Sequence, residues 1–345
     1  MTHAPADAPH PAALAAPTKR ARVLSGIQPS GAFHIGNYLG AVRTWVEEVE
    51  AQRDETLFCV VDAHAITVPY DPKDLRTRIV ELATDLIACG LDPAKTTLFV
   101  QSDVREHMEL AWYLASVTPM GDLSRMTQFK EKSEDKEFVS TALFTYPVLM
   151  SADILLYKAT IIPVGDDQLQ HLELARETAR RFNHRFGRIL REPKPRLSSA
   201  PRIMGLDGAG KMSKSKGNSV ALFDPPDVFW KKIRGAFTDP QRLRLSDPGR
   251  PEICNIYTMH KAVSPEATCA EVYVNCTTAK WGCVDCKKVM FDNFDRELVP
   301  LRVRREELEA KPALVHEALM DGAAKARAIA ESTMREVRSA MGLGG

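Results

Sequence analysis

Residues 22–37, RVLSGIQPSGAFHIGN, decide the fold class of this chain. The run Arg22–Ile27 has the apolar, β-rich character of a buried strand, and small turn residues follow it. If a helix begins near His34, then His34 and Asn37 lie on one face, and the free N–H groups at the helix start favour a phosphate. Corners of this kind also occur without any nucleotide, so this stretch alone leaves both interpretations open.

The alternation of strand and helix continues along the chain. Further strands are predicted at residues 57–62, 97–102 and 160–164, and helices are clearest at residues 72–89 and 167–182. Continuous apolar strands that alternate with helices indicate a parallel sheet covered on both faces. The fold class we expect is therefore α/β, with a Rossmann-type parallel sheet that binds its ligands beyond the strand ends.

The composition excludes several classes of protein. Of the 345 residues, 44% are apolar and 26% are charged, with 46 Lys and Arg against 45 Asp and Glu. The length favours two domains, and the apolar fraction excludes a largely disordered chain. No apolar run approaches the roughly 18–20 residues that span a bilayer, so a membrane protein is excluded. The balanced charge argues against a nucleic-acid binder that works by bulk positive charge, but not against one that uses local basic patches.

The N-terminus and the cysteines indicate the compartment. Residues 1–20 are rich in Ala and Pro and lack both the basic and the apolar region of a signal peptide, so we expect a disordered tail there. Seven cysteines are an odd number and do not form the dense pattern of a small secreted scaffold. Together these features predict a protein of the reducing cytoplasm, in which Cys59 and Cys89 are core residues.

A second stretch that can carry chemistry is GKMSKSKGN at residues 210–218. It belongs to a segment rich in Pro, Lys, Gly and Ser, residues 193–218, that we expect to be a flexible junction. A mobile loop with several lysines suits a polyphosphate whose negative charge grows in a transition state. A solvated basic loop is the alternative. Beyond the junction the pattern is mostly helical, at residues 225–236 and 306–341.

A third group consists of four cysteines, Cys254, Cys276, Cys283 and Cys286, with 21, 6 and 2 residues between successive members. Cys283 and Cys286 can chelate one metal centre, and the other two complete a four-thiolate site. The spacing does not separate zinc from an iron–sulfur cluster, because both accept four thiolates. Cys269 is a spare thiol, and unrelated reduced thiols are the alternative.

Two of these stretches, HIGN at residues 34–37 and KMSKS at residues 211–215, are the two signatures of class I aminoacyl-tRNA synthetases. The segments VDAHAIT, MTQFKEKS, YPVLMSADILLY and PVGDDQLQHLEL extend the match. In order and spacing, residues 22–343 closely resemble the bacterial tryptophanyl-tRNA synthetases. The resemblance implies an enzyme that activates L-tryptophan with ATP to tryptophanyl-adenylate and pyrophosphate, and then transfers tryptophan to the 3′ end of tRNA(Trp).

The resemblance also implies the domain organisation and the partners. We expect a catalytic domain at residues 21–204, the KMSKS junction at 205–220, a helical anticodon-binding domain with the four cysteines at 221–328, and a C-terminal helix at 329–345. The family forms homodimers in which one tRNA spans both subunits. Residues 176–196 hold eight Lys and Arg against two acids, which makes them a candidate phosphate track, although a solvated helix face fits equally well.

For the ATP site, the resemblance assigns catalytic roles to His34 and Asn37 near the phosphates, to Lys211 and Lys214 on the pyrophosphate, and to Lys132 on the ATP phosphates. The implied ATP-binding set is Gln28, Gly36, Asn37, Gly165, Asp167, Lys211, Met212, Ser213, Lys214 and Ser215. Mg²⁺ is expected with ATP, bound mostly by phosphates and water. The nucleophile is the tryptophan carboxylate, so no catalytic triad is needed, and catalysis comes from positioning and charge.

For the tryptophan site, a helix over residues 146–157, with a proline in its first turn, places Tyr146, Met150 and Asp153 on one face. Such a stripe also occurs in plain core packing, but an unpaired buried carboxylate is costly, which favours a pocket. Asp153 can accept the indole N–H, and Met150 offers a polarizable contact to the ring. Leu24 stands where the family often has phenylalanine. The resemblance adds four residues to the pocket, namely Ser25, Gln28, Val164 and Gln168.

A subset of the family carries a [4Fe-4S] cluster on the spacing C-x22-C-x6-C-x2-C, and this chain has 21 residues in the first gap. The resemblance therefore favours a [4Fe-4S] cluster on Cys254, Cys276, Cys283 and Cys286, with Zn²⁺ as the alternative. Three other functions stay open: a tyrosyl-tRNA synthetase, a non-catalytic redox-sensing tRNA-binding paralogue, and a small-molecule adenylyltransferase. ATP–pyrophosphate exchange with each amino acid separates the tyrosyl enzyme from the tryptophanyl enzyme.

Overall fold

The computed structural model describes residues 20–134, 138–197, 203–210, 212 and 217–344, apart from the side chain of Lys132. All of the expected N-terminal tail except Arg20 therefore lies outside the described residues. No helix in these ranges is long and apolar enough to cross a membrane.

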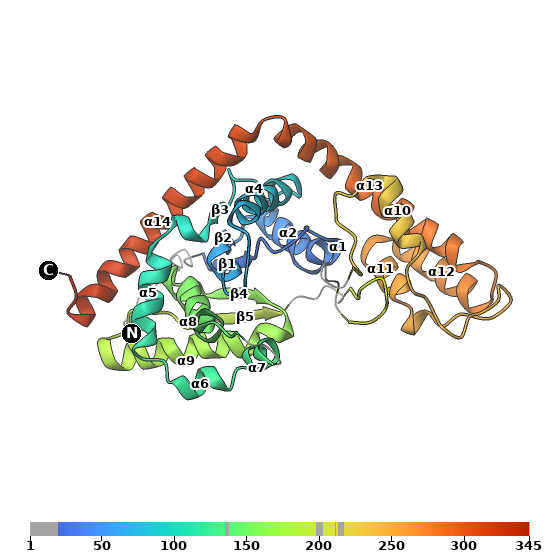
Figure 1. The fold of residues 1–345 in the computed structure, drawn as a ribbon. Helices are drawn as coiled ribbons and strands as arrows, with labels where there is room; N and C mark the ends of the chain where they lie inside the picture. Colours follow the sequence, from blue (N-terminus) through green and yellow to red (C-terminus); the bar gives the residue numbers. More distant parts are fainter. Residues whose placement is uncertain (1–19, 135–137, 198–202, 211, 213–216, 345) are drawn as a thin grey trace, which may run out of the picture.

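Five parallel strands form one sheet in the order β3-β2-β1-β4-β5 (Figure 1). The chain adds β2 and β3 on one side of β1 and then β4 and β5 on the other, so the order reverses between β1 and β4. Open parallel sheets bind their ligands at such a reversal, beyond the carboxyl ends of the strands. The expected α/β parallel sheet is confirmed. The strands are β1 Arg22–Ile27, β2 Glu55–Val60, β3 Thr97–Val100, β4 Ile161–Val164 and β5 Lys194–Leu197.

Helices cover both faces of the sheet, and a separate apolar core lies on each face. On one face Trp45 stacks on Phe58 with ring centroids 5.0 Å apart. On the other, Phe99 packs against Tyr157 at 5.6 Å. The helices before β5 are α1 Ile35–Asn37, a π-helical turn Tyr38–Val42, α2 Arg43–Ala51, α3 Asp62–Ala65, α4 Pro72–Ala88, α5 Glu106–Ala115, α6 Met120–Ser124, α7 Thr127–Ser133, α8 Thr141–Leu156 and α9 Leu169–Phe186.

Local sequence signals account for the ends of the two helices that were clearest in the sequence. Asp71 caps α4 by accepting hydrogen bonds from two backbone N–H groups of the first turn, and Pro72 occupies the first helical position. α9 begins two residues later than expected and continues to Phe186. It ends at Gly187, whose φ of +100° favours glycine.

The chain after residue 220 is helical, as expected. α10 Pro226–Arg234, α11 Asn255–Val263 and α12 Glu266–Thr277 form a group at one end of the molecule, and two long helices, α13 Cys283–Glu309 and α14 Pro312–Met341, form an arch from this group back over the sheet (Figure 1). The expected boundary at residue 328 falls inside α14, which is one continuous helix.

The arch closes one edge of the sheet. α14 packs along β3 so closely that a Cβ atom at Gly322 would lie 1.8 Å from the carbonyl oxygen of Leu98. The bidentate pair between Arg338 and Glu109 of α5 holds the other end of α14. An exposed edge strand is a template for unwanted pairing, and α14 covers it.

The expectation of an irregular junction over residues 193–218 was partly wrong, because β5 begins at Lys194. Its sequence, KPRL, lacks the apolar character that identified the other strands. β5 pairs only with β4 and forms the second edge of the sheet, where a proline and charged residues are tolerated. Its register places Pro195 opposite Ile162.

Candidate active site

A cavity of about 410 Å³ opens at the reversal point between β1 and β4. Its walls include the carboxyl ends of these two strands and α8, from which the sequence predicted the tryptophan site, together with residues of α2, α3, α5 and α7. Leu24, at the phenylalanine position of the family, also lines it. All seven residues expected to bind tryptophan line this one cavity, namely Ser25, Gln28, Tyr146, Met150, Asp153, Val164 and Gln168.

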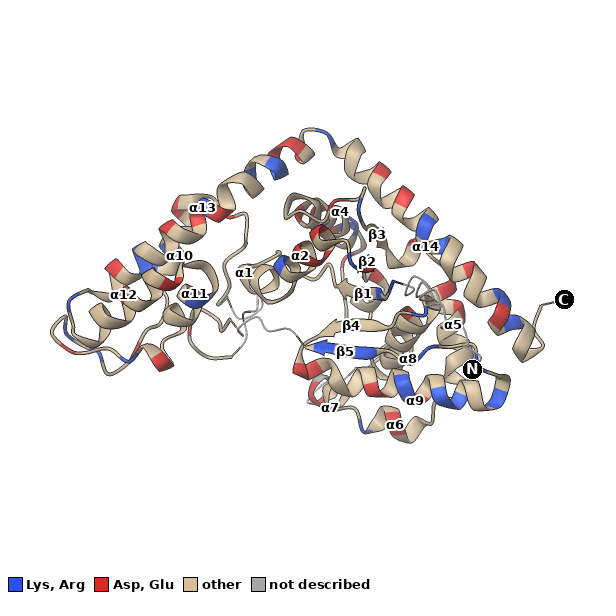
Figure 2. Ribbon diagram, turned by 180° about the vertical axis from the view of Figure 1, so that it is seen from behind, with Lys and Arg blue, Asp and Glu red and all other residues tan. Residues whose placement is uncertain are grey.

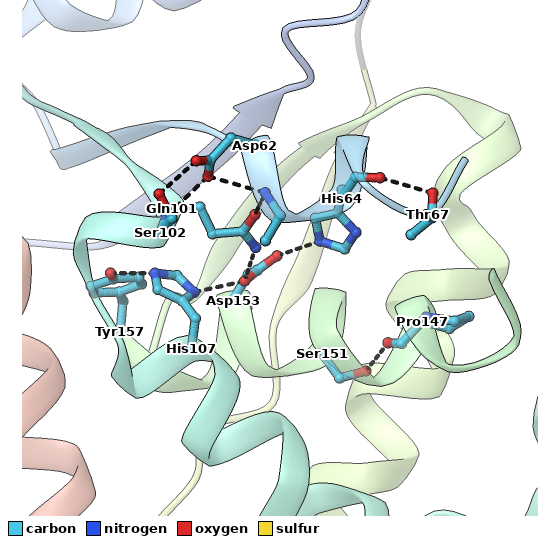
Figure 3. Close-up of polar contacts among 11 residues, drawn as sticks. Asp62, His64, Thr67, Gln101, Ser102, His107, Pro147, Ser151, Asp153 and Tyr157 are labelled. Atoms are coloured by element: carbon cyan, nitrogen blue, oxygen red, sulfur yellow. Dashed lines mark hydrogen bonds and ion pairs between the residues drawn. The ribbon is translucent and has the colours of Figure 1, made fainter. Parts of the chain in front are cut away.

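α8 differs from the expected helix in its start. It begins at Thr141 rather than Tyr146, with Ser140 as its N-cap, so Pro147 lies inside the helix and not in its first turn. A proline there lacks the N–H that would bond the preceding turn. One turn later, the Ser151 hydroxyl donates to the Pro147 carbonyl at 2.9 Å (Figure 3). Despite the proline, the helix presents Met150 and Asp153 to the same cavity.

Asp153 is buried and accepts hydrogen bonds from three side chains (Figure 3). Its Oδ1 accepts from Nε2 of Gln101 at 2.7 Å and from Nδ1 of His107 at 2.6 Å. Its Oδ2 accepts from Nε2 of His64 at 2.8 Å. Burial alone would raise the pKa of this carboxyl, but the hydrogen bonds from the two histidines outweigh it and hold the pKa well below its usual range. Asp153 is therefore an ionised acceptor inside the cavity.

Further hydrogen bonds fix the orientation of these donors. Gln101 accepts from the Ala63 backbone N–H through Oε1, which directs its Nε2 toward Asp153. The Tyr157 hydroxyl lies 2.8 Å from Nε2 of His107. Burial raises the pKa of Tyr157 well above its usual range, so its hydroxyl keeps its proton. His107 carries a proton on Nδ1, the atom that faces the Asp153 carboxylate, and in the neutral ring Nε2 then accepts from the Tyr157 hydroxyl.

The sequence interpretation missed these supporting residues: His64, Gln101, His107 and Tyr157. His64 stands in the VDAHAIT segment that carried part of the resemblance, and Gln101 directly follows a predicted strand, so a signal existed for both. Nothing local in the sequence connects His107 on α5 with Asp153 on α8.

A second cavity, of about 520 Å³, adjoins the first. The two share lining residues, among them Gly165 and Gln168, at the end of β4. Gln28, expected in both substrate sets, lines the first cavity. The members of the expected ATP and catalytic sets that line the second are His34, Gly36, Asn37, Gly165, Asp167 and Met212.

The HIGN turn differs from the expected helix start in one respect. His34 is the N-cap of α1, and its Nδ1 accepts from the Asn37 N–H at 3.2 Å, while Oδ1 of Asn37 accepts from the His34 N–H at 3.1 Å. These two N–H groups are therefore not free for a phosphate. Burial lowers the pKa of His34, and a neutral ring that accepts at Nδ1 carries its proton on Nε2. His34 can thus donate one hydrogen bond from its side chain to an anion in the second cavity.

The KMSKS loop is described only in part. Lys211, Ser213, Lys214 and Ser215 lie outside the described residues, and of Lys132 only the backbone, within α7, is described. Met212 is buried and lines the second cavity.

The segments flanking this loop are hydrogen-bonded to each other. The Leu206 N–H, before the loop, donates to the carbonyl of Asn218, after it, at 2.8 Å, and within the segment before the loop the Gly205 N–H donates to the carbonyl of Gly210 at 2.9 Å. The first of these bonds joins the described segments on either side of the loop, and Ile203 and Met212 of this region line the second cavity.

The four expected metal ligands gather at one end of the helical region. Arg242 lies between two of them, with Nη1 3.7 Å from Sγ of Cys276 and 3.9 Å from Sγ of Cys283. Burial, followed by the nearness of the other three thiols, raises the pKa of Cys286 to about 12. None of the seven cysteines, all of which lie among the described residues, forms a disulfide bond. The spare Cys269 makes a separate contact, 3.4 Å from the carbonyl oxygen of His260.

Among the residues that the structure describes, no group of three or more His, Cys, Asp and Glu side chains stands in metal-binding geometry. The four thiols are therefore close enough to perturb one another but are not arranged as a preformed ligand set.

The candidate phosphate track of residues 176–196 is only partly available to RNA, because acidic and basic residues alternate along α9 (Figure 2). Arg176 and Arg180 are paired with glutamates of the same span and with Glu173. Arg181 pairs with Asp122, and Arg196 pairs with Glu48 and Asp54. The exposed basic side chains of the span are Arg185, Arg188, Arg191 and Lys194.

Comparison with known proteins matches this geometry to one family. Residues 16–298 match the family model of class I tRNA synthetases for W and Y. The tryptophan–tRNA ligase of Deinococcus radiodurans is 51% identical over 324 residues, which cover 93% of this chain and 98% of that protein. The ligase of Thermotoga maritima is 42% identical, covering 93% of this chain and 99% of its own length.

A solved structure agrees with the sequence relatives. The tryptophanyl-tRNA synthetase of Campylobacter jejuni, complexed with ADP and tryptophan, superimposes with a TM-score of 0.84 at 36% identity. The superposition covers 93% of this chain and 100% of that one. This chain therefore belongs to the tryptophanyl-tRNA synthetases, the tryptophan–tRNA ligases of class I.

Proposed function

We propose that the first cavity binds L-tryptophan through the Asp153 carboxylate and that the second binds ATP. The observation that carries this proposal is the count of hydrogen bonds at Asp153. An ionised carboxylate offers about four acceptor positions, and three donors occupy two on Oδ1 and one on Oδ2. One position remains on Oδ2 in a cavity with apolar walls, which fits a flat apolar side chain with a single N–H donor.

The walls support an indole more than a polar side chain. Leu24, Met150, Ile162 and Val164 line the cavity, and a thioether beside a ring is a favourable contact. Phenylalanine has no N–H, so it would leave a buried acceptor unpaired, a cost by which a site can reject a substrate without editing. The decisive experiment is ATP–pyrophosphate exchange with tryptophan, tyrosine and phenylalanine, followed by charging of tRNA(Trp). Exchange with tyrosine and not with tryptophan would overturn the proposal.

Adenylate formation needs no protein nucleophile. A carboxylate oxygen of tryptophan attacks the α-phosphorus, and the bond from that phosphorus to the pyrophosphate oxygen breaks. The protein's part is to align the two reactants and to balance charge on the leaving pyrophosphate. We assign the donor Nε2 of His34 to the phosphates, and Lys132, Lys211 and Lys214 to the same anion, with Mg²⁺ bound mainly by ATP.

The Lys214→Ala variant tests this assignment. Adenylate formation should slow by orders of magnitude while equilibrium binding of tryptophan changes little, because the lysine acts on charge that develops in the transition state. Unchanged pyrophosphate exchange in this variant would refute the role.

At the four cysteines we propose a [4Fe-4S] cluster, with Zn²⁺ as the alternative. The mutual approach of the four thiols supports a shared site, although these described side chains are not in metal-binding geometry in this structure. The Arg242 guanidinium beside two of them favours the thiolate form, against the burial that raises the pKa of Cys286. A cluster or a zinc ion would supply a cross-link between α11, α12 and α13. Anaerobic purification followed by visible absorbance and iron and sulfide assays decides between them, and stoichiometric zinc without iron would refute the cluster.

For tRNA, we propose that the exposed part of the basic span contacts phosphates. The Arg188→Ala variant should reduce the slope of log affinity against log salt by about one unit. Arg180, which is paired with three glutamates, is the matched control, and its alanine variant should leave the slope unchanged. Equal effects of the two substitutions would exclude this surface.

For the homodimer, we propose an interface on α5 and α6. Trp112 is 78% exposed, Met108 lies one turn away on the same face, and Met120 at the start of α6 is 75% exposed. Met108 and Trp112 are neighbours by helical spacing, and adjacent large apolar side chains on a surface favour an interaction site. Sedimentation of the Trp112→Glu variant should show a monomer. The control Leu243→Glu, at an equally exposed position of the helical region, should leave the dimer intact.

A further inference from the structure

The HIGN turn, residues 34–37, is held from two sides by parts of the chain that lie far away in the sequence. On one side His34 forms an isolated bridge with Ala221, and the Ile35 N–H donates to the carbonyl of Val220 at 3.1 Å. On the other side stands α13. The turn is therefore placed as much by the chain after residue 220 as by the strand that precedes it.

The contact with α13 is made by the residue directly after the signature. Tyr38 is 5% exposed, and its hydroxyl donates to Oε1 of Glu297 at 2.7 Å. Its ring lies against Phe294, one turn earlier on α13, with centroids 6.4 Å apart. Burial and the Glu297 carboxylate raise the pKa of Tyr38, so the hydroxyl keeps the proton that it donates.

Glu297 makes a second contact with Arg43, the residue directly after the π-helical turn Tyr38–Val42. Its Oε2 lies 3.7 Å from Nη1 of Arg43, and the same guanidinium donates to the carbonyl of Ala262 on α11 at 2.8 Å. One carboxylate thus holds both ends of the turn Tyr38–Val42 that follows the signature. Glu297 lies near the middle of α13, about 21 Å from Cys283 at the start of the helix, at the helical rise of about 1.5 Å per residue.

We propose that Glu297 is a positioning residue for adenylate formation, which fixes the HIGN turn against the ATP phosphates through Tyr38 and Arg43. The inference rests on the proposed ATP site. A reacting phosphate must be aligned within fractions of an ångström, so a shift of the turn costs rate even when the fold survives. α13 has a second anchor on the catalytic domain, where Arg305 donates to Asp85 of α4 at 2.6 Å, and neither of these residues lines the second cavity.

The second anchor provides the control. The variants Tyr38→Phe and Glu297→Gln keep the shape of the contact and remove the hydroxyl or the charge. Each should lower kcat/KM for ATP in pyrophosphate exchange by roughly 5- to 20-fold, less than the full effect of one hydrogen bond to a charged group, because the turn keeps its other anchors. KM for tryptophan should stay within twofold, and the double variant should be little worse than the more damaging single one, because both break one unit. Asp85→Asn should leave all of these constants within twofold.

Equal losses in Asp85→Asn, or an equal effect on the KM of ATP and of tryptophan, would show that Glu297 is only structural and would overturn the inference. Failure of the proposed function is a separate result, because it shows as absent tryptophan-dependent exchange in the unaltered protein. Calorimetric binding of Mg·ATP to the same variants, with thermal unfolding as a check on folding, then tests the positioning role without turnover. Unchanged ATP affinity in folded Glu297→Gln would refute it there.

Discussion

Replacing Asp153 by asparagine tests the tryptophan site most directly. The amide keeps one oxygen, and its best orientation leaves that oxygen on the side of Gln101 and His107, which supply two of the three donors. The amide nitrogen then faces His64 and the position proposed for the indole N–H, so two donors meet a third. The substrate loses its acceptor although the size of the cavity is unchanged.

The expected loss follows from the type of bond removed. A hydrogen bond to a charged acceptor contributes about 1.5–3 kcal/mol, which corresponds to roughly a 10- to 200-fold fall in kcat/KM for tryptophan. The buried His64 donor also loses its acceptor, which should lower the free energy of unfolding by about 1–3 kcal/mol. Thermal unfolding shows whether the variant remains folded at the temperature of the assay.

The informative assay compares tryptophan with its benzothiophene analogue, in which sulfur replaces the indole N–H. Asp153→Asn should reduce pyrophosphate exchange with tryptophan and leave exchange with the analogue nearly unchanged, so that the preference between them collapses. The control Met150→Leu, a volume-conserving change in the same cavity, should affect both amino acids alike. An Asp153→Asn variant that loses activity equally with both amino acids would refute the indole assignment.

Three further predictions concern the frame of the site. Tyr157→Phe removes the hydroxyl that contacts Nε2 of His107, which in turn donates to Asp153. In pyrophosphate exchange, the preference for tryptophan over the benzothiophene analogue should therefore fall by roughly 3- to 10-fold. Gly322→Ala should lower the free energy of unfolding by about 1–3 kcal/mol in denaturant titration, because its Cβ would collide with the Leu98 carbonyl, whereas Gly235→Ala, with no atom closer than 3.6 Å, should not. Burial, opposed by Arg305, raises the pKa of Asp85 from 3.8 to about 6. Protonated Asp85 therefore stabilises the folded state, fully below pH 4, and this stabilisation of about 3 kcal/mol in the free energy of unfolding is lost as the pH rises through about 6. Urea unfolding at pH 4 and pH 8 should show this step, and Asp85→Asn should lack it.

The parts of the fold that local sequence determines were predicted closely. Arg22–Ile27 is β1 to the residue, because this β-rich run is followed directly by the turn-forming residues that end the strand. α4 was predicted to within one residue, since an Asp-Pro start and an apolar stripe define it. β5 was missed because its pairing with β4, rather than its own composition, makes it a strand.

The site was predictable to the same extent and for the same reason. Tyr146, Met150 and Asp153 share a helix, so their spacing alone placed them together. The donors to Asp153 come from α3, from the turn after β3 and from α5, and contacts between such distant segments leave no periodic signal in one sequence. The link from Tyr38 to Glu297 spans 259 residues and was equally beyond local reasoning.

The way in which Asp153 is supported explains how selectivity can arise from a carboxylate. An arginine partner would engage both oxygens at once through its planar fork and leave no acceptor directed at the cavity. Here three separate donors, each from a different element, hold the carboxylate while one lone pair of Oδ2 remains for a ligand. The three protein donors already stabilise the negative charge, so the carboxylate stays ionised in the empty site. A substrate with an N–H supplies the fourth donor, whereas a substrate without one leaves a buried acceptor unpaired. Discrimination therefore depends on the number of donors at this carboxylate, and any variant that frees a second acceptor position, such as one lacking the Gln101 amide, should relax it by admitting water.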